Sequence, residues 1–289
     1  MKYFAPQSLD EALEVLEKGK NNLKILAGGT DLIVLLKEKK IKTDGILDIG
    51  YISSLKYIKE EKGLIKIGSL ATHSDVEESS LINEKAWVLK EAVSTIGSPQ
   101  IRNRGTIAGN LAHSSPAGDS IPALVVLDSV LTLASVRGER IVAVDEFFTG
   151  PGKNVMEKDE IIKEIALKPL KKESIAFFSK LGQRKSLAIS KVSVAFEASY
   201  IKGVLSEVRI ALGAVAPSVI RAKRTERYLE GKKLGIEIIE EASQVIIEEA
   251  SPIDDIRSSR DYRKKMTGAL FYRGLYKYLN PANKNQPLK

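Results

Sequence analysis

Two short stretches of this sequence place glycine beside hydroxyl side chains, a combination suited to binding phosphate. The first, Ala27–Asp31, follows the apolar run Leu23–Ala27 and precedes an apolar segment that starts at Leu32. This order predicts a strand, a glycine turn, and a helix capped by Thr30 or Asp31. Uncovered backbone N–H groups at such a turn favour an anion such as a pyrophosphate.

The first motif is weak when taken alone. It has neither the Gly-x-Gly-x-x-Gly spacing of dinucleotide folds nor the Lys-Ser/Thr of a P-loop. Many strand-to-helix turns use two glycines only for their backbone geometry. A structural role for Gly28 and Gly29 therefore stays open at this point.

The second stretch runs from Thr95 to Asp128 and interrupts a chain of otherwise ordinary composition. Because glycine permits positive φ and proline removes a backbone donor, the segment predicts a long ordered loop at a binding surface, not a helix or a central strand. A loop that packs only on itself is the alternative. The residues that carry this prediction are Gly97, Pro99, Gly105, Gly109, Pro116, Gly118 and Pro122.

The composition excludes several kinds of chemistry. The sequence has no cysteine, so it can form no disulfide, no thiolate zinc site and no cysteine-ligated iron–sulfur cluster. Its two histidines, His73 and His113, are too few for a histidine-rich metal site and are expected to make local hydrogen bonds. No nucleophile, acid–base pair or metal triad stands out, so neither catalytic nor metal-binding residues are predicted.

Charge and hydropathy limit the partners. The net charge of +8 comes from dispersed basic residues with few aromatic neighbours, which argues against nucleic-acid binding. No run approaches 18 apolar residues and the first residues form no apolar signal core, so we expect no membrane span and a cytoplasmic protein.

Hydrophobic patterning predicts the elements that position the two stretches. Residues 1–54 read as a small α/β lobe, residues 55–170 as a second lobe containing a hairpin around Arg137, and residues 174–280 as three strands followed by three helices. A charged, proline-containing linker separates the last two regions, and residues 281–289 read as a frayed tail.

Taken together, the two stretches and further short motifs resemble the FAD-binding subunit of the molybdenum hydroxylases, the family of xanthine, nicotinate and aerobic carbon monoxide dehydrogenases. The resemblance covers nearly the whole chain, and the ordered set of motifs is more specific than any one of them. The matching segments are 27–31, 106–110, 115–119, 147–152, 159–162, 180–181, 184–190, 211–217 and 262–263.

The resemblance implies an α+β fold with a two-lobed FAD-binding domain of the vanillyl-alcohol-oxidase (PCMH) type, followed by an α+β C-terminal domain with a three-stranded antiparallel sheet and helices. It also implies that both glycine stretches hold the FAD pyrophosphate. The residues so implied to bind FAD are Lys24, Ile25, Leu26, Ala27, Gly28, Gly29, Thr30, Asp31, Thr106, Ile107, Ala108, Gly109, Asn110, Asp119, Ile162 and Lys180.

The implied activity is that of an oxidoreductase subunit in a heteromeric complex. Electrons would come from an iron–sulfur small subunit that serves a molybdopterin-binding large subunit, and would leave the FAD for NAD⁺ or another acceptor. Two departures bear on the site: Ala108 replaces a glycine usual in the family, and Phe178 lies near where some relatives have a tyrosine.

Two other functions stay open on sequence grounds. One is a self-contained flavin oxidase or reductase with its own small organic substrate. The absent cysteines, the two histidines and the compact third region argue against it. The other is a non-enzymatic adaptor with a degenerate nucleotide fold, which would be colourless when purified.

Overall fold

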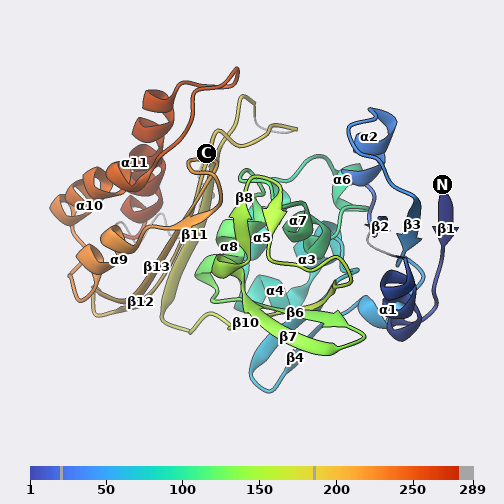
Figure 1. The fold of residues 1–289 in the computed structure, drawn as a ribbon. Coiled ribbons are helices and arrows are strands. Elements are labelled where there is room, and N and C mark those ends of the chain that lie inside the picture. Colours follow the sequence, from blue (N-terminus) through green and yellow to red (C-terminus); the bar gives the residue numbers. More distant parts are fainter. Residues whose placement is uncertain (20–21, 185–186, 280–289) are drawn as a thin grey trace.

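The structure is a computed structural model that describes residues 1–19, 22–184 and 187–279. We call residues 1–54 lobe 1, residues 55–170 lobe 2 and residues 174–279 the C-terminal region. Lobe 2 lies between the other two (Figure 1). The predicted tail at 281–289 falls outside the described residues. No helix within those residues is both long and apolar enough to cross a membrane.

Lobe 1 is a small parallel sheet with a helix on one face. The strand order β1-β3-β2 places the central strand between two parallel neighbours, and α1 packs its apolar side on the sheet. Ser8 caps α1, since its hydroxyl accepts the N–H of Glu11. The elements are β1 (Lys2–Phe4), α1 (Leu9–Lys18), β2 (Leu23–Leu26), α2 (Leu32–Lys37) and β3 (Gly45–Asp48).

Lobe 2 is built on a five-stranded antiparallel sheet of order β4-β5-β10-β6-β7, covered by helices. The hairpin expected around Arg137 is confirmed, because β6 pairs with β7 there. The short helix η1 (Ser53–Leu55) crosses the boundary between the two lobes. The elements of lobe 2 outside the second glycine stretch are β4 (Ile58–Glu61), β5 (Leu64–Gly68), α3 (His73–Glu78), α4 (Ser80–Lys85), α5 (Trp87–Ser94), β6 (Val130–Ser135), β7 (Gly138–Ala143), η2 (Val144–Glu146), β8 (Phe148–Gly150), β9 (Lys153–Asn154) and β10 (Ile161–Leu167).

The prediction that residues 95–128 form one long loop is wrong. Three short helices lie there: α6 (Pro99–Arg102), α7 (Ile107–His113) and α8 (Ser120–Val126). The small hydroxyl residues that suggested a loop are helix caps, because Ser98 accepts the N–H of Ile101 and Thr106 accepts that of Gly109. Pro99 and Pro122 occupy first turns, where a missing N–H removes no helical bond.

The C-terminal region is an antiparallel sheet with helices on one face, as predicted. Its sheet has four strands instead of three, since β13 also pairs with a two-residue strand too short to leave a pattern in the sequence. The elements are β11 (Ser174–Leu181), β12 (Val192–Ile201), β13 (Val204–Gly213), β14 (Ile220–Arg221), α9 (Lys223–Leu229), α10 (Ile236–Glu249) and α11 (Arg260–Tyr276).

This sheet divides its side chains between two cores. Phe177 and Phe196 stack beneath α9–α11, whereas the neighbouring Phe178 and Ala195 join the core of lobe 2 under α5 and α8. The alternation follows the two-residue period of a strand. The C-terminal sheet is therefore attached to lobe 2 through a continuous apolar core.

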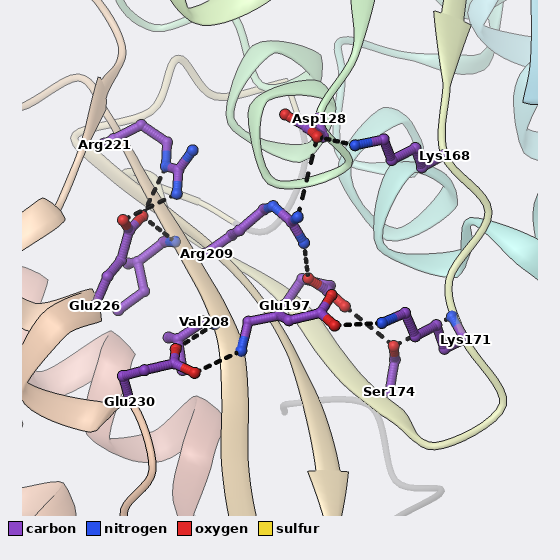
Figure 2. Close-up of polar contacts among 12 residues, drawn as sticks. Asp128, Lys168, Lys171, Ser174, Glu197, Val208, Arg209, Arg221, Glu226 and Glu230 are labelled. Atoms are coloured by element: carbon purple, nitrogen blue, oxygen red, sulfur yellow. Dashed lines mark hydrogen bonds and ion pairs between the residues drawn. The ribbon is translucent and has the colours of Figure 1, made fainter.

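Side chains close both edges of the sheet. On the β13 edge, Glu226 accepts the N–H of Ile210 and Glu230 accepts the N–H of Val208 (Figure 2). On the β11 edge, the carboxylate of Glu91 in α5 accepts the N–H of Phe178 at 2.8 Å. Each carboxylate satisfies donors that an open edge would leave unpaired.

Ion pairs also join lobe 2 to the sheet. Arg209 in β13 lies 2.9 Å from Glu197 and 3.9 Å from Asp128, which follows α8 (Figure 2). The linker residue Lys168 pairs with the same Asp128. The apolar and polar contacts together hold α8 in place against the C-terminal sheet.

Candidate functional site

The two glycine stretches meet at one seam between lobe 1 and lobe 2. A Cβ placed on Gly28 would lie only 2.0 Å from the carbonyl oxygen of Arg104 and 2.9 Å from the Cα of Gly105. The turn after β2 therefore lies directly on the peptide that precedes α7. We call residues 28–31 and 104–110 the lobe seam.

Gly28 has a structural role. The space that a Cβ would fill is occupied by the backbone of Arg104. Gly28 is needed because the backbones of the two lobes touch there. Gly29 has φ +75°, a conformation that favours glycine.

The first turn nevertheless keeps backbone donors free. Within the described chain, the N–H groups of Gly28, Gly29 and Thr30 donate no hydrogen bond. All three residues are partly exposed. Three neighbouring N–H donors without partners on one turn fit an anionic group such as a diphosphate.

Asp31 starts α2 without capping it. Its side chain makes no bond to the first turn of the helix, contrary to the capping role considered for it. Its Oδ1 lies 3.9 Å from Nε2 of His113 at the end of α7, across the lobe seam. Both side chains are partly exposed, so this contact adds little to stability.

The second turn is built by Thr106. Its hydroxyl accepts the N–H of Gly109, and a Cβ on Gly109 would lie 2.8 Å from that oxygen. Ala108 lies in the first turn of α7 with negative φ, so the replacement of the family's usual glycine introduces no strain. Ile107 and Ala108 point into the core, and Asn110 accepts the hydroxyl of Ser120 at 2.8 Å.

Asp119 and Lys180 form a buried ion pair that connects lobe 2 to the C-terminal sheet. The Lys180 ammonium lies 2.5 Å from Oδ2 of Asp119 and also donates to the carbonyl of Thr95. The hydroxyl of Ser190 donates to the other carboxylate oxygen at 2.5 Å. Burial raises the pKa of Asp119, and the lysine and serine oppose that rise. The charge of Lys180 is thus already balanced within the protein.

Two further residues of the predicted site region lie in the core of lobe 2. Ile162 of β10 is 4% exposed and pairs with Leu133, and Phe178 is 6% exposed. Their packing explains their apolar character without a ligand. A contact between either side chain and a flavin stays a prediction.

Sequence reasoning missed His73. It was expected to make a local hydrogen bond, but its buried imidazole makes none with the described residues, while its backbone N–H donates to the carbonyl of Gly105 at 2.9 Å. His73 and Gly105 are far apart in the sequence, so no local signal indicated their contact.

Two family models together match most of the chain. Residues 1–169 match the FAD binding domain in molybdopterin dehydrogenase, and residues 177–278 match the CO dehydrogenase flavoprotein C-terminal domain.

Curated relatives agree over nearly full length. The chain is 35% identical over 274 residues to the nicotinate dehydrogenase FAD-subunit of Eubacterium barkeri, covering 93% of each protein. It is 32% identical to the xanthine dehydrogenase FAD-binding subunit of Escherichia coli O157:H7, covering 90% of each.

Solved structures show the same fold. A chain of carbon monoxide dehydrogenase from Hydrogenophaga pseudoflava superposes with a TM-score of 0.92 at 30% identity, covering 96% of both chains. A chain of quinoline 2-oxidoreductase from Pseudomonas putida 86 gives a TM-score of 0.91 at 27% identity, covering 98% of both.

Proposed function

Since this chain belongs to the family of FAD-binding subunits of the molybdenum hydroxylases, with FAD as its cofactor, we propose that it passes electrons from a partner's iron–sulfur clusters to NAD⁺ or another acceptor. The observation that carries the proposal is the lobe seam, where a turn with unpaired backbone donors lies against a second glycine turn from another lobe. Bound FAD would supply the redox chemistry, since it can take up two electrons and release them singly or as a pair.

The chain's own part is to hold and orient that cofactor. Gly28, Gly29 and Thr30 would donate their free N–H groups to the diphosphate, next to the turn before α7. We propose that the residues lining FAD are those expected from the sequence: 24–31, 106–110, Asp119, Ile162 and Lys180.

The ion pair between Asp119 and Lys180 gives both residues a defined role. Because Asp119 binds both Lys180 and Ser190, it fixes the position of the C-terminal sheet relative to α8. Lys180 would then orient the cofactor from a fixed position, with most of its charge already balanced. We further propose that residues 1–54, 55–170 and 174–280 act as the structural units of this arrangement.

The absence of cysteine from the sequence indicates which partners the chain needs. Without cysteine, the chain cannot ligate an iron–sulfur cluster through thiolates, so one-electron carriers must belong to another polypeptide. The relatives are named as subunits or medium chains of larger dehydrogenases. We propose an iron–sulfur small subunit and a molybdopterin-binding large subunit as partners, in the cytoplasm.

The test is reduction of the FAD-loaded chain by two routes. We expect a co-purified iron–sulfur subunit, once reduced, to bleach the flavin absorbance, and NAD⁺ or a quinone to restore it. Small alcohols and amines added to the chain alone should leave the absorbance unchanged. Direct bleaching by such a substrate would contradict the electron-transfer role and support a self-contained oxidase.

A further inference from the structure

His73 lies at the point where the two lobes touch. A Cβ placed on Gly105 would have three nearest neighbours, Cδ2 of His73 at 3.2 Å, the carbonyl oxygen of Ile101 at 3.2 Å and Oγ1 of Thr30 at 3.3 Å. The imidazole of lobe 2 and the first glycine turn of lobe 1 therefore border the same glycine. This juxtaposition puts a polar ring close to the side chain of Thr30, in the turn that carries the free donors of residues 28–30.

The two ring nitrogens of His73 have different surroundings. Nδ1 is fully enclosed and has no hydrogen-bond partner. Nε2 also makes no hydrogen bond within the described chain, but it is not enclosed, although the residue as a whole is only 3% exposed. Nε2 is bonded to Cδ2, the ring atom nearest Gly105, so the accessible nitrogen is on the side of the lobe seam.

These surroundings determine the state of the ring. A buried N–H without an acceptor is rarer in proteins than an unused lone pair, so the proton belongs on Nε2 and the lone pair on Nδ1. Burial, with a smaller effect from the nearby Arg102, lowers the pKa of His73 to about 4. At neutral pH the residue is an uncharged ring with one unused donor.

We infer that His73 is a further FAD-binding residue, whose Nε2–H donates to a diphosphate oxygen held in the lobe seam. The inference rests on the proposed site. Like the free N–H groups of Gly28, Gly29 and Thr30, Nε2–H is a hydrogen-bond donor without a partner, and it approaches from the opposite lobe. Hydrogen bonds from both lobes to one diphosphate would link the lobes where Gly28 already touches Arg104.

Amide side chains of two lengths give a direct test. The amide nitrogen of glutamine can take the place of Nε2, whereas that of asparagine reaches only the position of Nδ1. We expect H73Q to bind FAD about as tightly as the unsubstituted chain, and H73N and the apolar H73L to bind it about 10- to 100-fold more weakly. The dissociation constants come from quenching of flavin fluorescence as apoprotein is added.

Ligand fragments locate the contact. ADP, which keeps a diphosphate, should lose affinity in H73N and H73L as FAD does, whereas riboflavin, which has no phosphate, should bind all variants alike. An H73L chain that binds FAD as the unsubstituted chain does, or an H73N chain that matches H73Q, would overturn the inference while leaving the FAD site intact. Failure of the unsubstituted chain to bind FAD would instead overturn the proposed site itself.

A measurement on the unsubstituted chain covers the case in which a variant does not fold. In a ¹⁵N-labelled protein, addition of ADP should shift the Nε2 resonance of His73 and leave that nitrogen protonated. An Nε2 resonance that does not move when ADP binds would overturn the inference.

Discussion

The lobe seam has two walls: residues 28–31 with α2, and residues 104–110 with α7 and α8. The rest of the protein holds these two walls very differently. No residue of α2, which follows the first turn, is buried. The helix α7, which follows the second turn, buries Ile107, Ala108 and Leu111, and all seven residues of the next helix, α8, are buried. α2 lies at the outer end of lobe 1, and α8 lies between lobe 2 and the C-terminal sheet (Figure 1). The second wall is therefore positioned by the protein core, while the first depends on a few contacts across the seam.

One acidic residue on each wall gives the largest expected difference. Asp119→Ala should lower the free energy of unfolding by about 3–5 kcal/mol, because it leaves Lys180 buried without its partner. Asp31→Ala should cost less than about 1 kcal/mol, since Asp31 and His113 are partly exposed and 3.9 Å apart. Urea unfolding of both variants measures the difference, and equal losses would contradict the comparison.

A pair of leucines tests the same contrast without charge. Leu124→Ala in α8 should cost about 2–5 kcal/mol, because Leu124 is fully buried and its removal leaves a cavity. Leu35→Ala in the half-buried α2 should cost about 1 kcal/mol. Thermal and urea unfolding would show the order, and a costlier Leu35→Ala would mean that α2 is packed more firmly than the structure indicates.

The pH dependence of stability should reveal His73, which is buried against Gly105 of the second wall. The folded chain keeps His73 neutral down to a pKa of about 4, whereas an unfolded histidine takes up a proton near pH 6.5. The stabilising contribution is complete above pH 6.5 and is lost as the pH falls from 6.5 to about 4, by about 3 kcal/mol. Apoprotein unfolding measured across that range, with H73Q as control, checks it. An identical pH profile in the control would rule the contribution out.

Gly28→Ala should push the two walls of the lobe seam apart. The added Cβ would meet the backbone of Arg104, which cannot rotate away as a side chain could, so we expect a cost of about 1–3 kcal/mol and a matching loss of FAD affinity of about 10- to 100-fold. Gly235→Ala is the matched control, because a Cβ there meets no atom within 4 Å and its φ of −154° suits alanine. Equal FAD affinity in the two variants would show that contact between the walls is not needed for binding.

Much of the fold could be predicted because the elements are long and regularly patterned. Strands β11–β13 and helix α10 were anticipated closely, since alternation or helical periodicity extends over eight residues or more in each. Elements of two or three residues, such as β14 and β1, are too short to show a period. Helices α6 and α7 were missed because glycine and proline were interpreted as loop signals, although Ser98 and Thr106 are caps.

The geometry of the candidate site could not be predicted from the sequence. The family resemblance implied that the turns at 27–31 and 106–110 hold a diphosphate, but the residue types could not show that Gly28 packs against Arg104. The partnership of Asp119 with Lys180 and Ser190 depends on segments 61 and 71 residues apart in the sequence. Contacts of that kind arise from tertiary packing, for which a single sequence carries no local signal.

A crystal structure of the chain with FAD tests the central claim most directly. The diphosphate should lie in the lobe seam, within hydrogen-bond distance of the N–H groups of Gly28, Gly29 and Thr30 on one side and beside residues 105–110 on the other. A diphosphate bound away from the lobe seam, with Gly28 still packed on Arg104 and its neighbouring donors unused, would contradict the claim.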